Sequence, residues 1–172
     1  GVARPTATGS VAPPVPVAAT PSPPTAPTGP ATVAATRPPT PAALPACADD
    51  ALRLAVATDA RSYPAGAQPR LSLTATNTGP APCLRDLGSR AVEWVIYSGV
   101  DRIWSSADCA PTASSEIRTL APGAATSVAL TWPRVRSDPQ CKGGPVAARP
   151  GTYVLLGRAG NVKAPGAVFV LE

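Results

Sequence analysis

The sequence predicts an all-β protein, an antiparallel β-sandwich of seven or eight strands that follows a Pro-rich segment. Two observations predict this fold. Short runs of alternating apolar and polar residues recur about every 10–25 residues between Pro, Gly and Asn turns. No segment keeps the 3.6-residue period of a helix for long. The four cysteines, with no histidine in the chain, favour two disulfides over a zinc site.

Residues 1–46 differ in composition from the rest of the chain. Pro (13), Ala (12), Thr (8) and Val (5) dominate the segment, which has only two charged residues, Arg4 and Arg37. Such a segment lacks the apolar pattern needed to offset its ordering entropy, so we expect a disordered, extended spacer. A recognition segment for a Pro-binding domain and an O-glycosylated stalk are the alternatives. Residues 47–172 are then one domain.

The first half of this domain contains four expected strands. The run 51–58 places Leu52, Leu54 and Val56 on one face, and the Pro-Gly sequence of 63–66 turns the chain into the next strand, 70–77. A third strand covers 91–97, with Val92, Trp94 and Ile96 on one face. A hairpin at 98–101 leads from it into a short strand that ends near 104.

The second half repeats this pattern with four more expected strands. A short strand at 116–120 precedes an Ala-Pro-Gly turn, and 125–132 places Val128, Leu130 and Trp132 on one face. The last two strands are 150–158 and 166–171. Tyr153 follows a Pro-Gly turn at the start of a late strand, the position of a tyrosine corner, whose hydroxyl bonds to nearby backbone.

The strand order also predicts which cysteines are paired. Cys47 precedes the first strand and Cys83 follows the second, and in an antiparallel pair these two ends lie side by side. We therefore expect the disulfides Cys47–Cys83 and, from the remaining two, Cys109–Cys141. Disulfides persist in oxidising compartments, so the sequence predicts an extracytoplasmic protein.

Composition argues against catalysis. Without histidine, Ser-His and Cys-His nucleophiles are excluded, and we predict that the protein is not an enzyme. A carboxylate pair is the alternative; its candidates would be Asp86, Glu93, Asp101, Asp108 and Glu116. The only acidic doublet, Asp49-Asp50, lacks a calcium-loop pattern, so we expect neither a metal nor another cofactor.

The aromatic residues divide between the core and a candidate binding surface. Trp94, Trp132, Tyr153 and Phe169 occupy inward positions and are predicted to form core. The sheet face or end with Tyr97, Asp101, Arg102 and Trp104 is the predicted binding surface, since exposed aromatic and arginine side chains anchor partners. For Trp104 core packing is the alternative.

Turn and core residues carry a resemblance to a known family. The Tyr-Pro-Ala-Gly turn at 63–66, Asn77, Trp104, the turn before the strand ending at Trp132, and Pro-Gly-Thr-Tyr at 150–153 resemble bacterial intracellular proteinase inhibitor-like domains. That resemblance covers about 63–153 and implies an immunoglobulin-like sandwich. The order of spacer and Cys-framed domain is also similar to secreted actinobacterial domains of unassigned function. Both the cysteines and the spacer depart from the inhibitor-like pattern and point to export.

These observations predict a non-catalytic binding or accessory module of the bacterial cell envelope. The partner is expected to be a protein or a cell-wall polymer, and contact with a membrane only through an anchor upstream of this sequence. The basic residues are scattered singly despite a net charge of +5, so nucleic acid is not expected. One alternative is a protease inhibitor that presents the segment 133–148, and another is a structural envelope component without a dedicated ligand.

Overall fold

The computed structural model describes residues 43–110 and 112–172. The predicted spacer therefore lies outside the described residues, apart from its last four positions. Those positions already join the fold, because the N–H of Leu84 donates to the carbonyl of Pro45 at 2.8 Å and Ala46 forms a β-bridge with Leu84. The hydrogen bonding of the domain therefore includes Pro45 and Ala46, which precede Cys47.

The prediction of an all-β, immunoglobulin-like sandwich is confirmed. In the described residues the only helical element is a single 3-10 turn, η1 (Asp49–Ala51), and no helix is long and apolar enough to cross a membrane. The strands are β1 (Leu52–Thr58), β2 (Ser62–Tyr63), β3 (Arg70–Asn77), β4 (Cys83–Asp86), β5 (Val92–Ser98), β6 (Asp101–Ser105), β7 (Ile117–Leu120), β8 (Ala125–Thr131), β9 (Val135–Arg136), β10 (Val146–Ala147), β11 (Gly151–Ala159), β12 (Val162–Lys163) and β13 (Ala167–Leu171).

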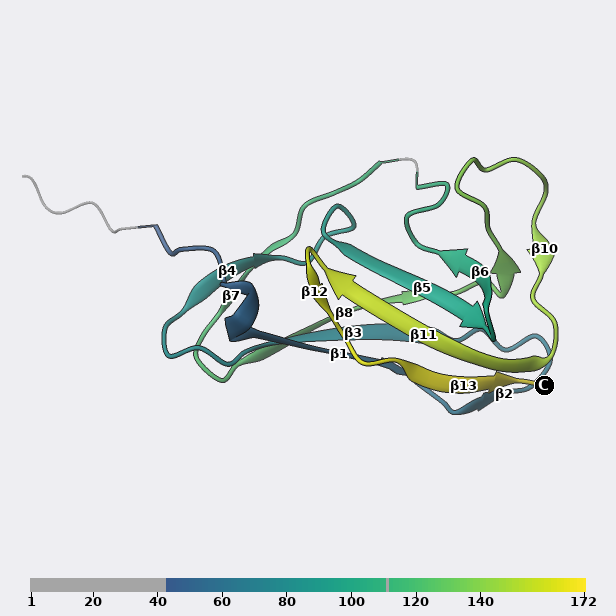
Figure 1. Cartoon of the computed structure of the whole chain (residues 1–172), viewed down its shortest axis with the longest axis horizontal. Coiled ribbons are helices and arrows are strands. Elements are labelled where there is room, and N and C mark those ends of the chain that lie inside the picture. Colours follow the sequence, from purple (N-terminus) through teal and green to yellow (C-terminus); the bar gives the residue numbers. More distant parts are fainter. Residues whose placement is uncertain (1–42, 111) are drawn as a thin grey trace, which may run out of the picture. The chain divides into compact units, whose positions relative to one another are not determined.

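Two sheets form the layers of the sandwich (Figure 1). One has the order β1-β3-β8, and the other has the order β2-β13-β11-β5-β6, with β12 paired to β11. All neighbours are antiparallel except β2, which runs parallel to β13. The strands β4 and β7 pair with each other, as do β9 and β10.

All eight expected strands are present within one or two residues of their predicted ends. The five additional strands are β2, β4, β9, β10 and β12, each two to four residues long. Strands of this length are too short to show a period-2 pattern, and tertiary pairing alone defines them. The turn expected at 63–66 lies one residue later, over 64–67: Gly66 has φ 83° and the N–H of Ala67 donates to the carbonyl of Pro64.

The core lies between the two sheets and has an aromatic cluster at one end. Trp132 is fully buried, and its ring lies 5.8 Å from that of Tyr153 and 6.1 Å from that of Phe169. Trp94 is also buried, so the four predicted core aromatics are core. The Tyr153 hydroxyl donates to the carbonyl of Arg149 at 2.5 Å, which is the bond expected of a tyrosine corner.

The two disulfides pair the cysteines in the way expected from the strand order. Cys47 is bonded to Cys83, with a Cα–Cα distance of 4.8 Å, and both residues are buried in the core. Cys109 is bonded to Cys141, with a Cα–Cα distance of 5.3 Å, in exposed chain outside both sheets. Two disulfides in a domain of this size indicate an oxidising environment.

Candidate functional site

The four residues of the predicted binding surface do not share one face. Tyr97 on β5 and Arg102 on β6 lie opposite each other in the strand register and share the outer face of the six-stranded sheet. Asp101 lies at the hairpin tip and is exposed. Trp104 lies opposite the buried Ile96, because the register shifts by one residue between the two pairs.

Trp104 therefore lies on the core side of the sheet. Its ring lies 6.5 Å from that of Trp132, and it is partly buried against the core. Of the two alternatives for this residue, the structure favours core packing. A β-bulge inverts the alternation that a regular hairpin would give, so the sequence pattern alone could not place Trp104.

Ion pairs fix the two charged residues of the predicted surface. Arg102 bonds to Asp108 at 2.8 Å, and Asp108 also accepts a bond from the Ser137 hydroxyl at 2.6 Å. Burial raises the pKa of Asp108, but the bonds from Arg102 and Ser137 outweigh it and hold the pKa below its usual value. Asp101 pairs with Arg136 at 3.0 Å, and this bond lowers the pKa of Asp101.

The outer face of the six-stranded sheet has an apolar strip that crosses three neighbouring strands. We call it the outer apolar strip; its members are Val95 and Tyr97 on β5, Val154 and Leu156 on β11, and Val168 and Val170 on β13. Val154 is the register partner of both Tyr97 and Val168, and Leu156 is the partner of Val95. The strip is therefore continuous across the hydrogen-bonded strands.

Much of this strip is open to solvent in the described part of the chain. The exposed fraction is 39% for Leu156, 61% for Val168 and 37% for Val170. Single exposed apolar residues are ordinary on protein surfaces, whereas contiguous ones mark contact sites. The outer apolar strip is thus the candidate contact surface.

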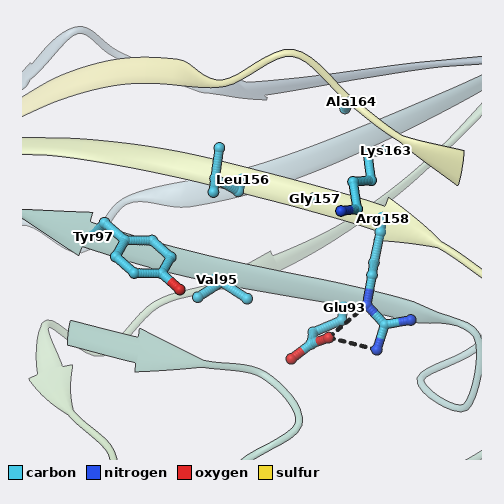
Figure 2. A pocket seen from close by; sticks show the side chains of 8 residues that line it. All are labelled: Glu93, Val95, Tyr97, Leu156, Gly157, Arg158, Lys163 and Ala164. Carbon is cyan, nitrogen blue, oxygen red and sulfur yellow. Dashed lines mark hydrogen bonds and ion pairs between the residues drawn. The ribbon is translucent and has the colours of Figure 1, made fainter. Parts of the chain in front are cut away.

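A shallow pocket of about 300 Å³ lies at one end of the strip. Figure 2 shows Tyr97 on one side of it, Val95 and Leu156 in the middle, and the Glu93–Arg158 ion pair on the other side. Arg158 binds Glu93 at 2.7 Å, and Glu93 also accepts a bond from the Ser105 hydroxyl. The pocket thus joins an apolar centre to a charged rim.

Gly157 lies in the floor of this pocket. A side chain at this position would point toward the other sheet. Its Cβ would overlap the Val56 side chain and would lie 3.1 Å from the Cδ1 atom of Leu73. Glycine at 157 therefore leaves room for the Val56 and Leu73 side chains of the other sheet to pack against the β11 backbone.

Asp86, Asp49 and Glu116 also have structural partners. Asp86 accepts bonds from the N–H groups of Gly88 and Glu116, each at 2.8 Å. Burial raises the pKa of Asp86, but these two bonds outweigh it and lower the pKa. Asp49 pairs with Arg85, and Glu116 with Arg118. Within residues 43–110 and 112–172, no cluster of three acidic, Cys or His side chains suits a metal ion.

The segment 133–148, expected to be a presenting loop, forms an exposed excursion. Its ends pair as β9 and β10, and Cys141 is bonded to Cys109. The backbone turns sharply at its tip, with φ 52° at Cys141 and 102° at Gly143. Lys142 lies exposed between these two residues.

Sequence reasoning found Tyr97 but missed most of the outer apolar strip. A signal was present, because 153–156 and 167–171 are apolar in both phases of the strand alternation. A strand that is apolar on both faces is expected to be covered on both faces.

Comparisons with known proteins identify no family for this chain. No family model matches it and no curated protein matches it. Among solved structures, a β-glucosidase from Erythrobacter marinus aligns with 70% of this chain and 15% of its own, at 16% identity and a TM-score of 0.46.

Two further structures show similar values. An alkylpurine DNA glycosylase of Pseudomonas fluorescens bound to DNA containing an abasic site analog aligns with 71% of this chain and 30% of its own, at 16% identity and a TM-score of 0.43. A β-glucosidase from Listeria innocua aligns with 70% of this chain and 16% of its own, at 10% identity and a TM-score of 0.42. This chain spans less than a third of the length of each of these proteins.

Proposed function

We propose that this chain is a non-catalytic binding module of the bacterial cell envelope, and that the outer apolar strip is its contact surface. The observation that supports this most is the exposure of Leu156, Val168 and Val170 on adjacent strands. Burying such side chains against a partner stabilises a complex by up to about 1.5–3 kcal/mol for each one fully covered. The disulfides favour an extracytoplasmic location, secreted or membrane-anchored and facing the cell wall.

The strip favours a protein partner over a wall polymer. Its members are aliphatic except for Tyr97, and interfaces between proteins have apolar centres with polar rims. The charged rim here is the Glu93–Arg158 pair together with Lys163, which borders the same pocket. A polysaccharide would instead require several stacking rings and open hydrogen-bonding groups.

Binding by matched variants tests this proposal. Leu156→Asp places a charge in the middle of the strip, while Ile117→Asp places one at a 58% exposed site on β7. We expect Leu156→Asp to weaken binding to envelope protein fractions at least tenfold and Ile117→Asp to leave it unchanged. Equal binding by both variants would refute the strip as the contact surface, and co-sedimentation with purified peptidoglycan alone would assign a wall polymer as the partner.

A protease inhibitor is the second candidate, and the resemblance to inhibitor-like domains and the disulfide-braced loop at Cys141 favour it. Lys142 at the loop tip would suit a protease that cleaves after basic residues. One observation opposes this candidate. The backbone has positive φ values at Cys141 and Gly143, so the loop tip is not the extended strand that a partner recognises by β-pairing. Stoichiometric inhibition of trypsin that is lost in Lys142→Ala would support this candidate. If the chain has no effect on trypsin, the remaining candidates are the binding module and a purely structural envelope component.

A further inference from the structure

In the part of the chain that the structure describes, the strand β8 is an open edge of the three-stranded sheet. It pairs with β3 on one side, in an unbroken register from Arg70–Thr131 to Thr76–Ala125. On its other side the described residues supply no strand and no backbone hydrogen bond. Within residues 43–110 and 112–172, this edge of seven residues therefore presents unpaired backbone groups.

The hydrogen bonds at the two ends of β8 show which groups are unpaired. The N–H of Trp132 donates to the carbonyl of Pro69 at 2.9 Å, and the N–H of Asn77 donates to the carbonyl of Ala124 at 3.0 Å. Hydrogen-bonded pairs alternate along an antiparallel ladder, so the even-numbered residues of β8 bond to β3. The outward N–H and C=O groups then belong to Ala125, Ser127, Ala129 and Thr131.

The side chains of β8 also lack cover. Val128 and Leu130 face the core but are only partly buried, whereas their partners on β3, Leu73 and Leu71, are fully buried. The core layer is thus incomplete on the side of β8 that has no neighbouring strand. Another strand beside β8 would cover both the backbone groups and these two side chains.

β8 has none of the features that usually protect an edge. Natural edge strands use charges, proline or bulges to prevent pairing with another chain, and β8 has only neutral side chains, no proline and a continuous register. The opposite sheet differs at β6, whose Ile103 carbonyl accepts a bond from the N–H of Ser137. That edge is covered by the chain itself.

We propose that two copies of this chain associate through antiparallel pairing of their β8 strands about a two-fold axis at Val128. This register places Ser127 opposite Ala129 of the other copy and Ala125 opposite Thr131, so every outward backbone group meets a partner. Because β8 is uncharged along its length, the two edges meet without like-charge repulsion. The result is one continuous sheet of six strands with closed symmetry.

The association is weak. One strand pair buries less than the roughly 1,200 Å² of a standard interface, which corresponds to a transient contact. We expect a dissociation constant between about 10 µM and about 1 mM. It is independent of the proposed function, because it uses the sheet opposite the outer apolar strip.

Sedimentation equilibrium of the full chain over this concentration range tests the proposal. Ala129→Pro removes an outward N–H without removing a bond to β3, and Ala129→Lys adds a charge at the edge. Ala57→Lys is the matched control, since Ala57, Ser72 and Ala129 form one row across the sheet and Ala57 lies on β1. We expect a dimer for the wild type, Ala57→Lys and Leu156→Asp, and at least a tenfold weaker dimer for both Ala129 variants.

A cysteine variant tests the register. Val128→Cys places the two new thiols opposite each other at the axis, so mild oxidation should give a covalent dimer, while Ala57→Cys should not. A wild type that stays monomeric throughout the range overturns the proposal, as does a dimer that survives Ala129→Lys or disappears in Leu156→Asp. If Ala129→Pro unfolds, the results for Ala129→Lys, Val128→Cys and Ala57→Cys decide whether the β8 strands pair.

Discussion

Removing the two disulfides separately should cost different amounts of stability. They close loops of similar length, with sequence separations of 36 for Cys47–Cys83 and 32 for Cys109–Cys141. Loop entropy therefore assigns them nearly equal contributions, about 3.8 and about 3.7 kcal/mol. Their burial differs, because Cys47 and Cys83 are 5% and 6% exposed while Cys109 and Cys141 lie outside the core.

Replacing each pair by alanine separates the two effects. Cys109→Ala/Cys141→Ala should lower the free energy of unfolding by about 3.7 kcal/mol, the entropic part alone. Cys47→Ala/Cys83→Ala also removes two sulfur atoms from the core, which adds about 1 kcal/mol for each side chain. Urea unfolding of the oxidised variants measures both values.

The two values also bear on the compartment. Together they amount to about 7.5 kcal/mol before packing is counted, which is comparable to the whole stability of a typical domain, about 5–15 kcal/mol. The domain should therefore unfold in reductant at 37 °C. Equal losses for the two double variants would show that burial of Cys47 and Cys83 adds nothing to stability. A reduced wild type that keeps its full urea midpoint would show that the disulfides do not stabilise the domain.

Three further predictions concern single groups. Tyr153→Phe should lower the free energy of unfolding by about 1–1.5 kcal/mol, because the bond to the Arg149 carbonyl is lost; calorimetry checks this, and an unchanged midpoint would contradict it. Gly157→Ala should cost about 1–3 kcal/mol, because its Cβ overlaps Val56; a stabilised variant in urea would show that the sheets are not in close contact there. Stability should fall as the pH drops below about 4, since the folded-state pKa of Asp108 lies below its unfolded value.

The free energy of unfolding should also be nearly independent of pH near neutrality. A carboxylate with a lowered pKa contributes stability that is fully present above the unfolded pKa and is lost as the pH falls through the folded pKa. The chain has no histidine and its described cysteines are all bonded, so stability should be nearly flat from about pH 5 to about pH 8. A transition near pH 6.5 in a urea series would contradict this.

The sequence predicted the long strands and the disulfides for a simple reason. Alternation over seven or more residues, as in 70–77, reports burial on one face of a sheet directly. The pairing of Cys47 with Cys83 followed from the order of β1 and β3 alone. These features depend on local pattern and chain order.

The site could be predicted only in part, because it depends on register and on both faces of the strands. The bulge between β5 and β6 turned Trp104 toward the core and left Arg102 beside Tyr97. The ion pair between Glu93 and Arg158 joins residues 65 positions apart. No local pattern states which strands become neighbours, so the outer apolar strip appears only once β5, β11 and β13 are placed side by side.

Site-specific photo-cross-linking in cells tests whether the outer apolar strip contacts a partner. A photoreactive aromatic amino acid replaces Leu156 in the outer apolar strip, or Ile117 on β7 as the control, in cells that produce the protein. We expect a discrete cross-linked product from position 156 and none from position 117. No product from position 156, or the same products from both positions, would contradict a binding function for this face of the sheet.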